Sequence, residues 1–167
     1  MAQVISVVQE KGGAGKTTLL TAIASLMVQD GARIAVIDTD PQRHLEAWAK
    51  KEQTDLDWLY EEDDEKLIPT VKALKKADPA YDAIFVDTAG FKSAMAMHAI
   101  AAANLILIPS KANEADATEV HSSVPGTVNE CTQYSRSSLL DSQFGLHGTL
   151  ELIAAKIGGD DLSFFPD

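Results

Sequence analysis

The sequence has one cysteine, little positive charge and no apolar run long enough to cross a membrane. Cys131 is the single cysteine among 167 residues, so an internal disulfide is excluded and a reducing compartment is expected. No stretch approaches the roughly 20 apolar residues that a membrane-spanning helix needs. The N-terminus shows neither a basic segment nor a cleavage site, so we expect no signal peptide and a cytoplasmic protein.

The shortage of positive charge gives a formal net charge of −11, from 14 Lys and Arg against 25 Asp and Glu. Non-specific DNA binding depends on Lys and Arg that neutralise phosphates, so the overall charge works against it, although a local basic patch stays open. The acidic run at residues 61–65 supplies much of the excess, and it is interpreted as a solvated loop or the start of a helix.

The order of the segments predicts an α/β fold. Four short apolar segments are predicted as buried strands, at residues 3–8, 33–38, 83–87 and 104–108, the last stopped by Pro109. Helices are predicted at residues 17–29, 42–51, 65–76 and 92–103, and a short edge strand at residues 56–60. This alternation predicts a doubly wound, mainly parallel sheet with helices on both faces, a Rossmann-like three-layer arrangement.

The chain changes character after Lys111. Residues 113–134 could start as a helix, which Pro125 and Gly126 interrupt, and residues 150–157 could form a final short helix. The length fits one domain, residues 1–167. Within it we expect residues 1–111 to form a nucleotide-binding core and residues 112–167 to be a divergent or shortened C-terminal part.

A glycine-rich turn follows the first predicted strand and opens the first helix. Its residues are Gly12, Gly13, Ala14, Gly15, Lys16 and Thr17. Glycines let backbone N–H groups point at a phosphate, and the helix N-terminus favours an anion. Lys16 offers a cation for the β- and γ-phosphates, and Thr17 offers a hydroxyl for Mg²⁺. The general form G-x-x-x-x-G-K-[ST] has glycine where this chain has Glu10, so the match is to a variant. The alternative is a glycine turn that binds nothing.

Carboxylates end the second and third strong strands, where ligand sites of open α/β sheets lie. Asp38 and Asp40 are two residues apart, so one carboxylate could steer the attacking water while the other supports Mg²⁺. Asp40 could instead only cap the following helix. Asp87 ends an apolar strand, the pattern of a Walker B aspartate that holds Mg²⁺ through its hydration shell, and Gly90 follows it.

Lys11 adds a second lysine to the same loop. Beside Lys16 it would suffer like-charge repulsion in an empty site, and a bound polyanion would relieve that cost. The alternative is an exposed lysine on a turn.

Three boxes together resemble the ParA/MinD family of P-loop ATPases. Residues 11–18 resemble its deviant Walker A box, residues 38–42 its Walker A′ box and residues 85–90 its Walker B box. The resemblance covers about residues 2–111. Asp-x-Asp-Pro-Gln is similar to the ParA branch, which partitions plasmids and chromosomes, in its short form without an N-terminal helix-turn-helix. Residues 38–48, with Trp48, also resemble the VirC1-like relatives linked to DNA transfer.

The resemblance implies a role for each box. ATP or ADP would be held by Gly12, Gly13, Ala14, Gly15, Lys16, Thr17 and Thr18. Thr17, Asp38 and Asp87 would support Mg²⁺. Lys16 would contact the β- and γ-phosphates, Lys11 would contact nucleotide across a face-to-face dimer, and Asp40 would position the hydrolytic water.

The resemblance also implies partners. These are a second copy of the chain in the ATP state, a ParB-type centromere-binding adaptor that stimulates slow hydrolysis, and non-specific DNA. No membrane partner is expected, because the sequence ends in acidic residues rather than a basic amphipathic helix. Three other functions stay open: a nucleotide-dependent interaction module or defective relative with little turnover, a DNA-transfer accessory similar to VirC1, and a small-molecule enzyme of the dethiobiotin-synthetase type.

Overall fold

The structure, a computed structural model, describes residues 1–9, 13–52, 56–90, 93–111, 130–135 and 150–156. Seven strands form one sheet in the order β3-β2-β4-β1-β5-β7-β6. The strands are β1 (Gln3–Val7), β2 (Ile34–Asp38), β3 (Asp57–Tyr60), β4 (Ala83–Asp87), β5 (Leu105–Lys111), β6 (Glu130–Ser135) and β7 (Leu150–Lys156). The four helices of the described residues are α1 (Lys16–Gln29), α2 (His44–Glu52), α3 (Asp64–Leu74) and α4 (Ala94–Ala102).

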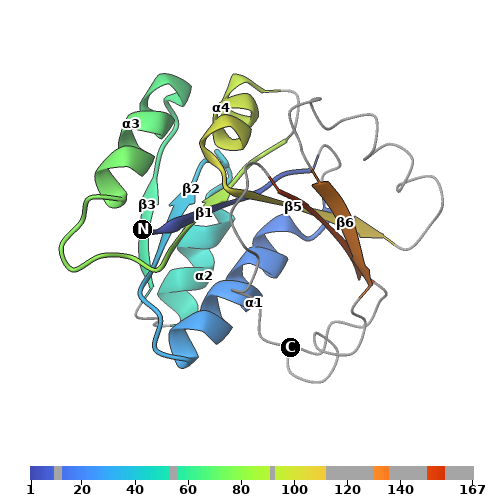
Figure 1. The fold of residues 1–167 in the computed structure, drawn as a ribbon, viewed down its shortest axis with the longest axis horizontal. Helices are drawn as coiled ribbons and strands as arrows, with labels where there is room; N and C mark the ends of the chain where they lie inside the picture. Colours follow the sequence, from blue (N-terminus) through green and yellow to red (C-terminus); the bar gives the residue numbers. More distant parts are fainter. Residues whose placement is uncertain (10–12, 53–55, 91–92, 112–129, 136–149, 157–167) are drawn as a thin grey trace.

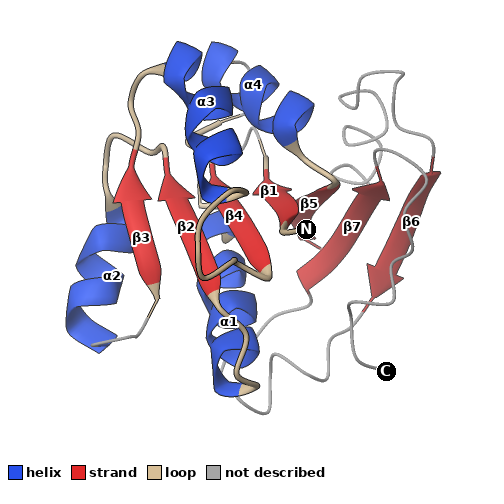
Figure 2. Ribbon diagram, turned by 60° about the vertical axis from the view of Figure 1, so that its left-hand side comes forward, coloured by secondary structure: helices blue, strands red, loops and turns tan. Residues whose placement is uncertain are grey.

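The first five strands are parallel, and helices cover both faces of this part of the sheet, as Figures 1 and 2 show. Successive side chains of the central strands enter opposite cores, as the strand period of two requires. Val36 and Phe85 pack with α1 and α2, whereas Ile37 and Val86 pack with α3 and α4. The predicted doubly wound α/β fold is confirmed.

Local chemistry explains where the helices begin and end. Gly15 caps α1 in the left-handed conformation, with φ 85°, and Gly31, with φ 88°, follows the end of that helix. Asp63 accepts a hydrogen bond from the N–H of Glu65 at 3.1 Å and so caps α3. The acidic run at residues 61–65 therefore contains a helix start, one of the two interpretations of the sequence. Ser93 caps α4 in the same way, through the N–H of Ala96 at 3.1 Å.

Two expectations about the later strands were wrong. Strand β5 continues through Pro109 to Lys111 instead of stopping at the proline. The carbonyls of Leu107 and Pro109 both point toward the end of β1, where they accept hydrogen bonds from the N–H of Val8 at 3.0 Å and the amide of Gln9 at 3.1 Å. The backbone pairing of β1 with β5 ends there, so the N–H that proline lacks is not needed for it.

The helix expected at residues 150–157 is instead strand β7, which pairs antiparallel with β5 from Leu105 to Lys111. In the stretch at residues 113–134, which could start as a helix and is interrupted at Pro125 and Gly126, the structure places strand β6 from Glu130, paired antiparallel with β7. Residues 112–129 lie outside the described residues. An available sheet edge at β5 overrides the helical propensity of the sequence, because backbone pairing there satisfies both strands. The sheet is therefore mainly parallel with two antiparallel strands at one side.

Candidate functional site

The predicted phosphate loop, the glycine-rich turn at residues 12–17, lies in the sequence between β1 and α1, at the edge where the parallel strands end. Gly13 has φ 72°, and no atom lies within 4 Å of a Cβ built there, so glycine is needed for its conformation and not for space. Lys16 opens α1 and is buried, with 8% exposure. The N-terminus of α1 therefore presents backbone donors and a lysine at the same place, which suits an anion. Lys11 and Gly12, both predicted in this site, lie outside the described residues.

The hydroxyl of Thr17 donates a hydrogen bond to Asp87 Oδ2 at 2.6 Å. Asp87 ends β4, and its Cα is paired in register with Val7 at the end of β1 and with Asp38 at the end of β2. Three strand ends and the first turn of α1 thus meet at one point. The structure brings together Thr17, Asp38 and Asp87, the three residues predicted to support a metal ion.

Two carboxylate oxygens at this point are buried without a hydrogen-bond partner. They are Asp38 Oδ2 and Asp87 Oδ1, on side chains that are each about 1% exposed. A buried carboxylate without compensation is unfavourable in a folded protein. The pKa of Asp87 is raised to about 6, mainly by burial; the Thr17 hydrogen bond opposes this rise and the charge of Asp38 adds to it. Burial also raises the pKa of Asp38, against the lowering effect of the Asp40 N–H.

These orphaned oxygens fit a hard divalent cation. Mg²⁺ prefers oxygen ligands and commonly takes one or two carboxylates, with the rest from phosphates and water. In the part of the chain that the structure describes, no three His, Cys, Asp or Glu side chains form a metal cluster. A cation here would therefore depend on Asp38, Asp87, the Thr17 hydroxyl and oxygens from a nucleotide or water. This donor set suits Mg²⁺ and does not suit zinc.

Asp40 lies in a turn directly after these carboxylates. Its N–H donates to Asp38 Oδ1 at 3.0 Å, and its own Oδ1 accepts from the N–H of Gln42 at 2.9 Å. The N–H of Arg43 donates to the carbonyl of Asp40 at 2.9 Å and closes the turn. Helix α2 begins only at His44, two residues later than predicted, because residues 40–43 form this turn. Asp40 is half-buried, so its carboxylate is accessible at the rim of the site.

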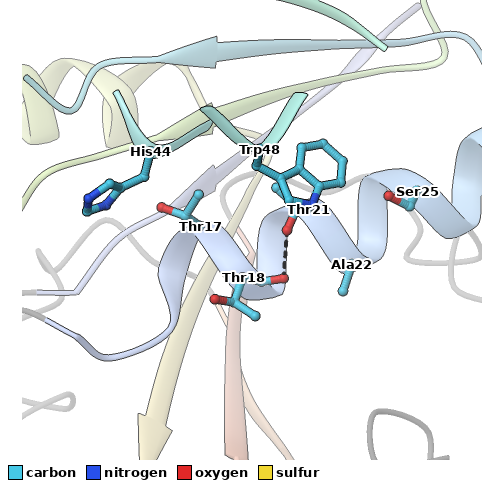
Figure 3. Close-up of a pocket in the computed structure, with 7 residues that line it drawn as sticks. All are labelled: Thr17, Thr18, Thr21, Ala22, Ser25, His44 and Trp48. Atoms are coloured by element: carbon cyan, nitrogen blue, oxygen red, sulfur yellow. Dashed lines mark hydrogen bonds between the residues drawn. The ribbon is translucent and has the colours of Figure 1, made fainter. Parts of the chain in front are cut away.

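A pocket of about 400 Å³ opens beside Thr17, between α1 and α2. Figure 3 shows Thr17, Thr18 and Thr21 on the α1 side, with His44 and Trp48 on the α2 side. The dashed line in Figure 3 is the hydrogen bond from the Thr21 hydroxyl to the Thr18 carbonyl, at 3.0 Å. Because Thr17 lines the pocket and also bonds to Asp87, the pocket lies next to the candidate cation site.

The sequence matches a protein-family model. The model described as VirC1 protein matches residues 2–130. The chain belongs to the VirC1 family. Relatives named ParA and virC1, together with solved structures that include MinD, confirm the resemblance to the ParA/MinD family predicted from the three boxes.

Two relatives come from Rhizobium radiobacter. Protein ParA is 32% identical over 117 residues, which are 69% of this chain and 51% of the relative. Protein virC1 is 32% identical over 123 residues, which are 70% of this chain and 52% of the relative. The chain therefore spans about half the length of these curated relatives.

A solved structure shows the same fold at lower identity. It is the septum site-determining protein MinD from Pyrococcus horikoshii OT3, solved as a complex with Mg-ADP. The likeness has a TM-score of 0.55 at 21% identity and covers 73% of this chain and 64% of MinD. This VirC1-family chain thus has the three-layer α/β fold of P-loop NTPases.

Two buried threonines of the site were missed by the sequence reasoning. The Thr39 hydroxyl donates to the carbonyl of Asp87 at 2.8 Å, and the Thr88 hydroxyl donates to the carbonyl of Val7 at 2.9 Å. These bonds tie β2 to β4 and β4 to β1 where the strands end. The available signal was their position next to Asp38 and Asp87, but a threonine at a strand end is common and indicates no partner by itself.

Proposed function

We propose that this VirC1-family chain binds Mg-ATP where β1, β2 and β4 end, and that ATP drives two copies to pair in a DNA segregation cycle. The observation that carries the proposal is the pair of orphaned oxygens of Asp38 and Asp87 beside the Thr17 hydroxyl. These unpaired, buried oxygens favour a bound cation beside the first turn of α1. A triphosphate with Mg²⁺ would pair the cation with these oxygens and the phosphates with the backbone N–H groups of the loop.

Each residue of the site has a role in this proposal. Lys16 and the backbone N–H groups from Gly13 to Thr18 hold the phosphates, as the N-terminus of a helix does. Asp38, Asp87 and Thr17 hold Mg²⁺, which neutralises charge on the phosphate oxygens when it is bound. Asp40 orients the attacking water, and its accessible carboxylate at the rim of the site suits that role. Lys11 contacts the nucleotide of the second copy, a role that rests on the family resemblance.

The partners of the proposal come from the family. The relatives named ParA and virC1 support a nucleotide-dependent function in DNA partition, and the complex of MinD with Mg-ADP supports the choice of ligand. A ParB-type adaptor would stimulate hydrolysis, and non-specific DNA would bind the paired state. ATP shifts the equilibrium toward the pair by binding it more tightly than it binds the single chain. No helix in the described ranges is long and apolar enough to cross a membrane.

A second candidate is a DNA-transfer accessory of the VirC1 type, favoured by the family match over residues 2–130. It uses the same ATP site and differs in the DNA that it serves. A nucleotide-dependent interaction module with little turnover differs from both because it would bind ATP without hydrolysing it at a measurable rate.

Light scattering and ATP turnover test the proposal together. With Mg-ATP the wild-type chain should double its mass and hydrolyse ATP slowly. Lys16→Ala should weaken nucleotide binding by roughly 100-fold and stay single, because it removes a buried cation from a polyanion. Asp40→Ala should bind ATP, pair, and fail to hydrolyse it.

Lys72→Ala is the matched control, since Lys72 is an exposed lysine on α3 and is not part of the site. It should behave as wild type in every measurement. An unchanged mass in saturating Mg-ATP would refute pairing, and normal turnover by Asp40→Ala would remove Asp40 from its role. ATP binding and pairing with no turnover in the wild type would favour the interaction module.

A further inference from the structure

One arginine next to the Asp40 turn is held in an unusual backbone conformation. Arg43 has φ 50°, and among the described residues it is the only non-glycine residue with a positive φ. The left-handed region costs energy for a side chain with a Cβ, so something in the surrounding structure must stabilise it there. Arg43 is also the residue that closes the turn carrying Asp40, because its N–H donates a hydrogen bond to the Asp40 carbonyl at 2.9 Å.

The side chain of Arg43 shows what stabilises this conformation. Its guanidinium carbon lies 4.0 Å from the centroid of the Tyr60 ring, a cation–π contact. Its NH1 also lies 3.8 Å from the carboxylate of Glu46, one turn further along α2. Tyr60 ends β3 and is paired in register with Asp38. Arg43 therefore joins the far end of the turn to the strand beside the cation site.

The contact of Arg43 with Tyr60 places its guanidinium away from the start of α1. The sheet order is β3-β2-β4-β1, and the phosphate loop follows β1, three strands away from Tyr60. The guanidinium turns outward to the edge strand β3, as the contact with Tyr60 requires. Through the turn at residues 40–43, Arg43 can affect the position of Asp40 without touching the nucleotide.

The turn is then fixed at both ends. At its beginning, Thr39 is bonded to the carbonyl of Asp87 and the N–H of Asp40 to Asp38. At its end, Arg43 is held over Tyr60. Asp40 lies between these two attachments, with Oδ1 used by the N–H of Gln42. The direction of its remaining carboxylate oxygen depends on both attachments, and small misplacements of a catalytic group lower rates strongly.

We propose that Arg43 is a positioning residue for ATP hydrolysis, which through its contact with Tyr60 fixes the turn that aims the Asp40 carboxylate. This inference rests on the proposed function. It assigns Arg43 no contact with nucleotide, so its loss changes the rate of hydrolysis and leaves nucleotide affinity unchanged.

The test compares kcat for ATP hydrolysis with the Kd for a fluorescent ATP analogue. Arg43→Ala and Tyr60→Leu should each lower kcat about tenfold at unchanged Kd, because each releases the turn. The double variant should be no slower than either single variant, since both remove the same contact. Tyr60→Phe keeps the ring and Arg43→Lys keeps the cation, so both variants should retain most of the wild-type rate. In an Asp40→Asn background, Arg43→Ala should change nothing further.

The chain contains a matched control at the other end of β2. Arg33 lies over the ring of Tyr81, also at 4.0 Å, and it is bonded to Asp57 at 3.2 Å. Arg33→Ala therefore removes a similar contact far from the Asp40 turn and should lower stability without lowering kcat. Tyr81→Phe is a milder variant of the same cluster that loses only the hydroxyl bonded to Asp57 at 2.8 Å.

Three results would overturn the inference. The first is wild-type kcat in both Arg43→Ala and Tyr60→Leu. The second is a rise in Kd by the same factor as the fall in kcat, which would make Arg43 a binding residue. The third is an equal fall in kcat for Arg33→Ala, which would mean that the lower kcat of Arg43→Ala reflects lost stability of the fold. A wild-type chain without Mg-ATP turnover would overturn the proposed ATPase and this inference with it, whereas normal wild-type turnover with any of the three results overturns the inference alone.

Discussion

Replacing Asp87 by Asn should stabilise the chain in the absence of nucleotide while removing its cation site. Asn keeps the shape of the side chain and removes the buried charge, and its carbonyl oxygen can still accept the Thr17 hydrogen bond. The destabilising element is the ionised carboxylate with its orphaned Oδ1, next to the second orphaned oxygen on Asp38. Asp87→Asn removes one of these two charges.

The magnitude follows from the pKa of Asp87. Because the pKa is about 6 in the folded chain and 3.8 ordinarily, the folded state binds more protons than the unfolded state between these values. The stability that this group contributes is complete below pH 3.8 and is lost as the pH rises through about 6. The difference corresponds to roughly 3 kcal/mol of unfolding free energy. Asp87→Asn should recover up to that amount at pH 8 and little at pH 4.

Urea unfolding at pH 4, 6 and 8 measures this directly, through the fluorescence of the two tryptophans, Trp48 and Trp58. The wild type should lose stability as the pH rises, and Asp87→Asn should lose less. Some pH dependence should persist, because burial also raises the pKa of Asp38. Added MgATP should stabilise the variant less than the wild type. Equal unfolding midpoints for the two proteins at pH 8 would refute the reasoning that Asp87 is buried as an uncompensated charge.

Three further substitutions test other parts of the site and the core. Thr17→Val should abolish the Mg²⁺ dependence of nucleotide binding, whereas Thr17→Ser should keep it, as a titration with a fluorescent nucleotide would show. Thr88→Val removes the hydroxyl that bonds the Val7 carbonyl and should destabilise by about 1 kcal/mol in urea unfolding. Phe85→Ala should destabilise by about 3–5 kcal/mol because Phe85 is fully buried, whereas Met97→Ala, at a half-exposed side chain of α4, should cost about 0.5 kcal/mol or less.

The strands that build the site were predictable because burial on both faces leaves a strong pattern. Residues 83–87 are apolar up to the terminal aspartate, and β4 has the predicted bounds. The contact of Thr17 with Asp87 follows from the same logic, since a phosphate loop and a strand-end aspartate meet at one edge of a parallel sheet. The box residues therefore predicted which side chains meet at this edge of the sheet, and their binding of a cation stays a prediction.

The C-terminal strands and the Arg43 contact could not be predicted. Residues 150–156 are rich in Leu, Ala, Glu and Lys, which favour a helix, and only the edge of β5 makes them a strand. The pairing of Arg43 with Tyr60 joins two residues on different elements, and no periodicity marks either of them. The positive φ of Arg43 is a property of the closed turn, so the sequence around it carries no glycine to indicate it.

The central claim is that Asp38, Asp87 and Thr17 bind a cation that a nucleotide brings with it. Isothermal titration of the wild-type chain with ATP, once with excess Mg²⁺ and once with EDTA, tests it most directly. The account predicts binding that is at least about tenfold tighter with Mg²⁺, a difference of about 1.4 kcal/mol, and no such difference in Asp87→Asn. Equal affinities with Mg²⁺ and EDTA in the wild type, or no binding of ATP under either condition, would contradict it.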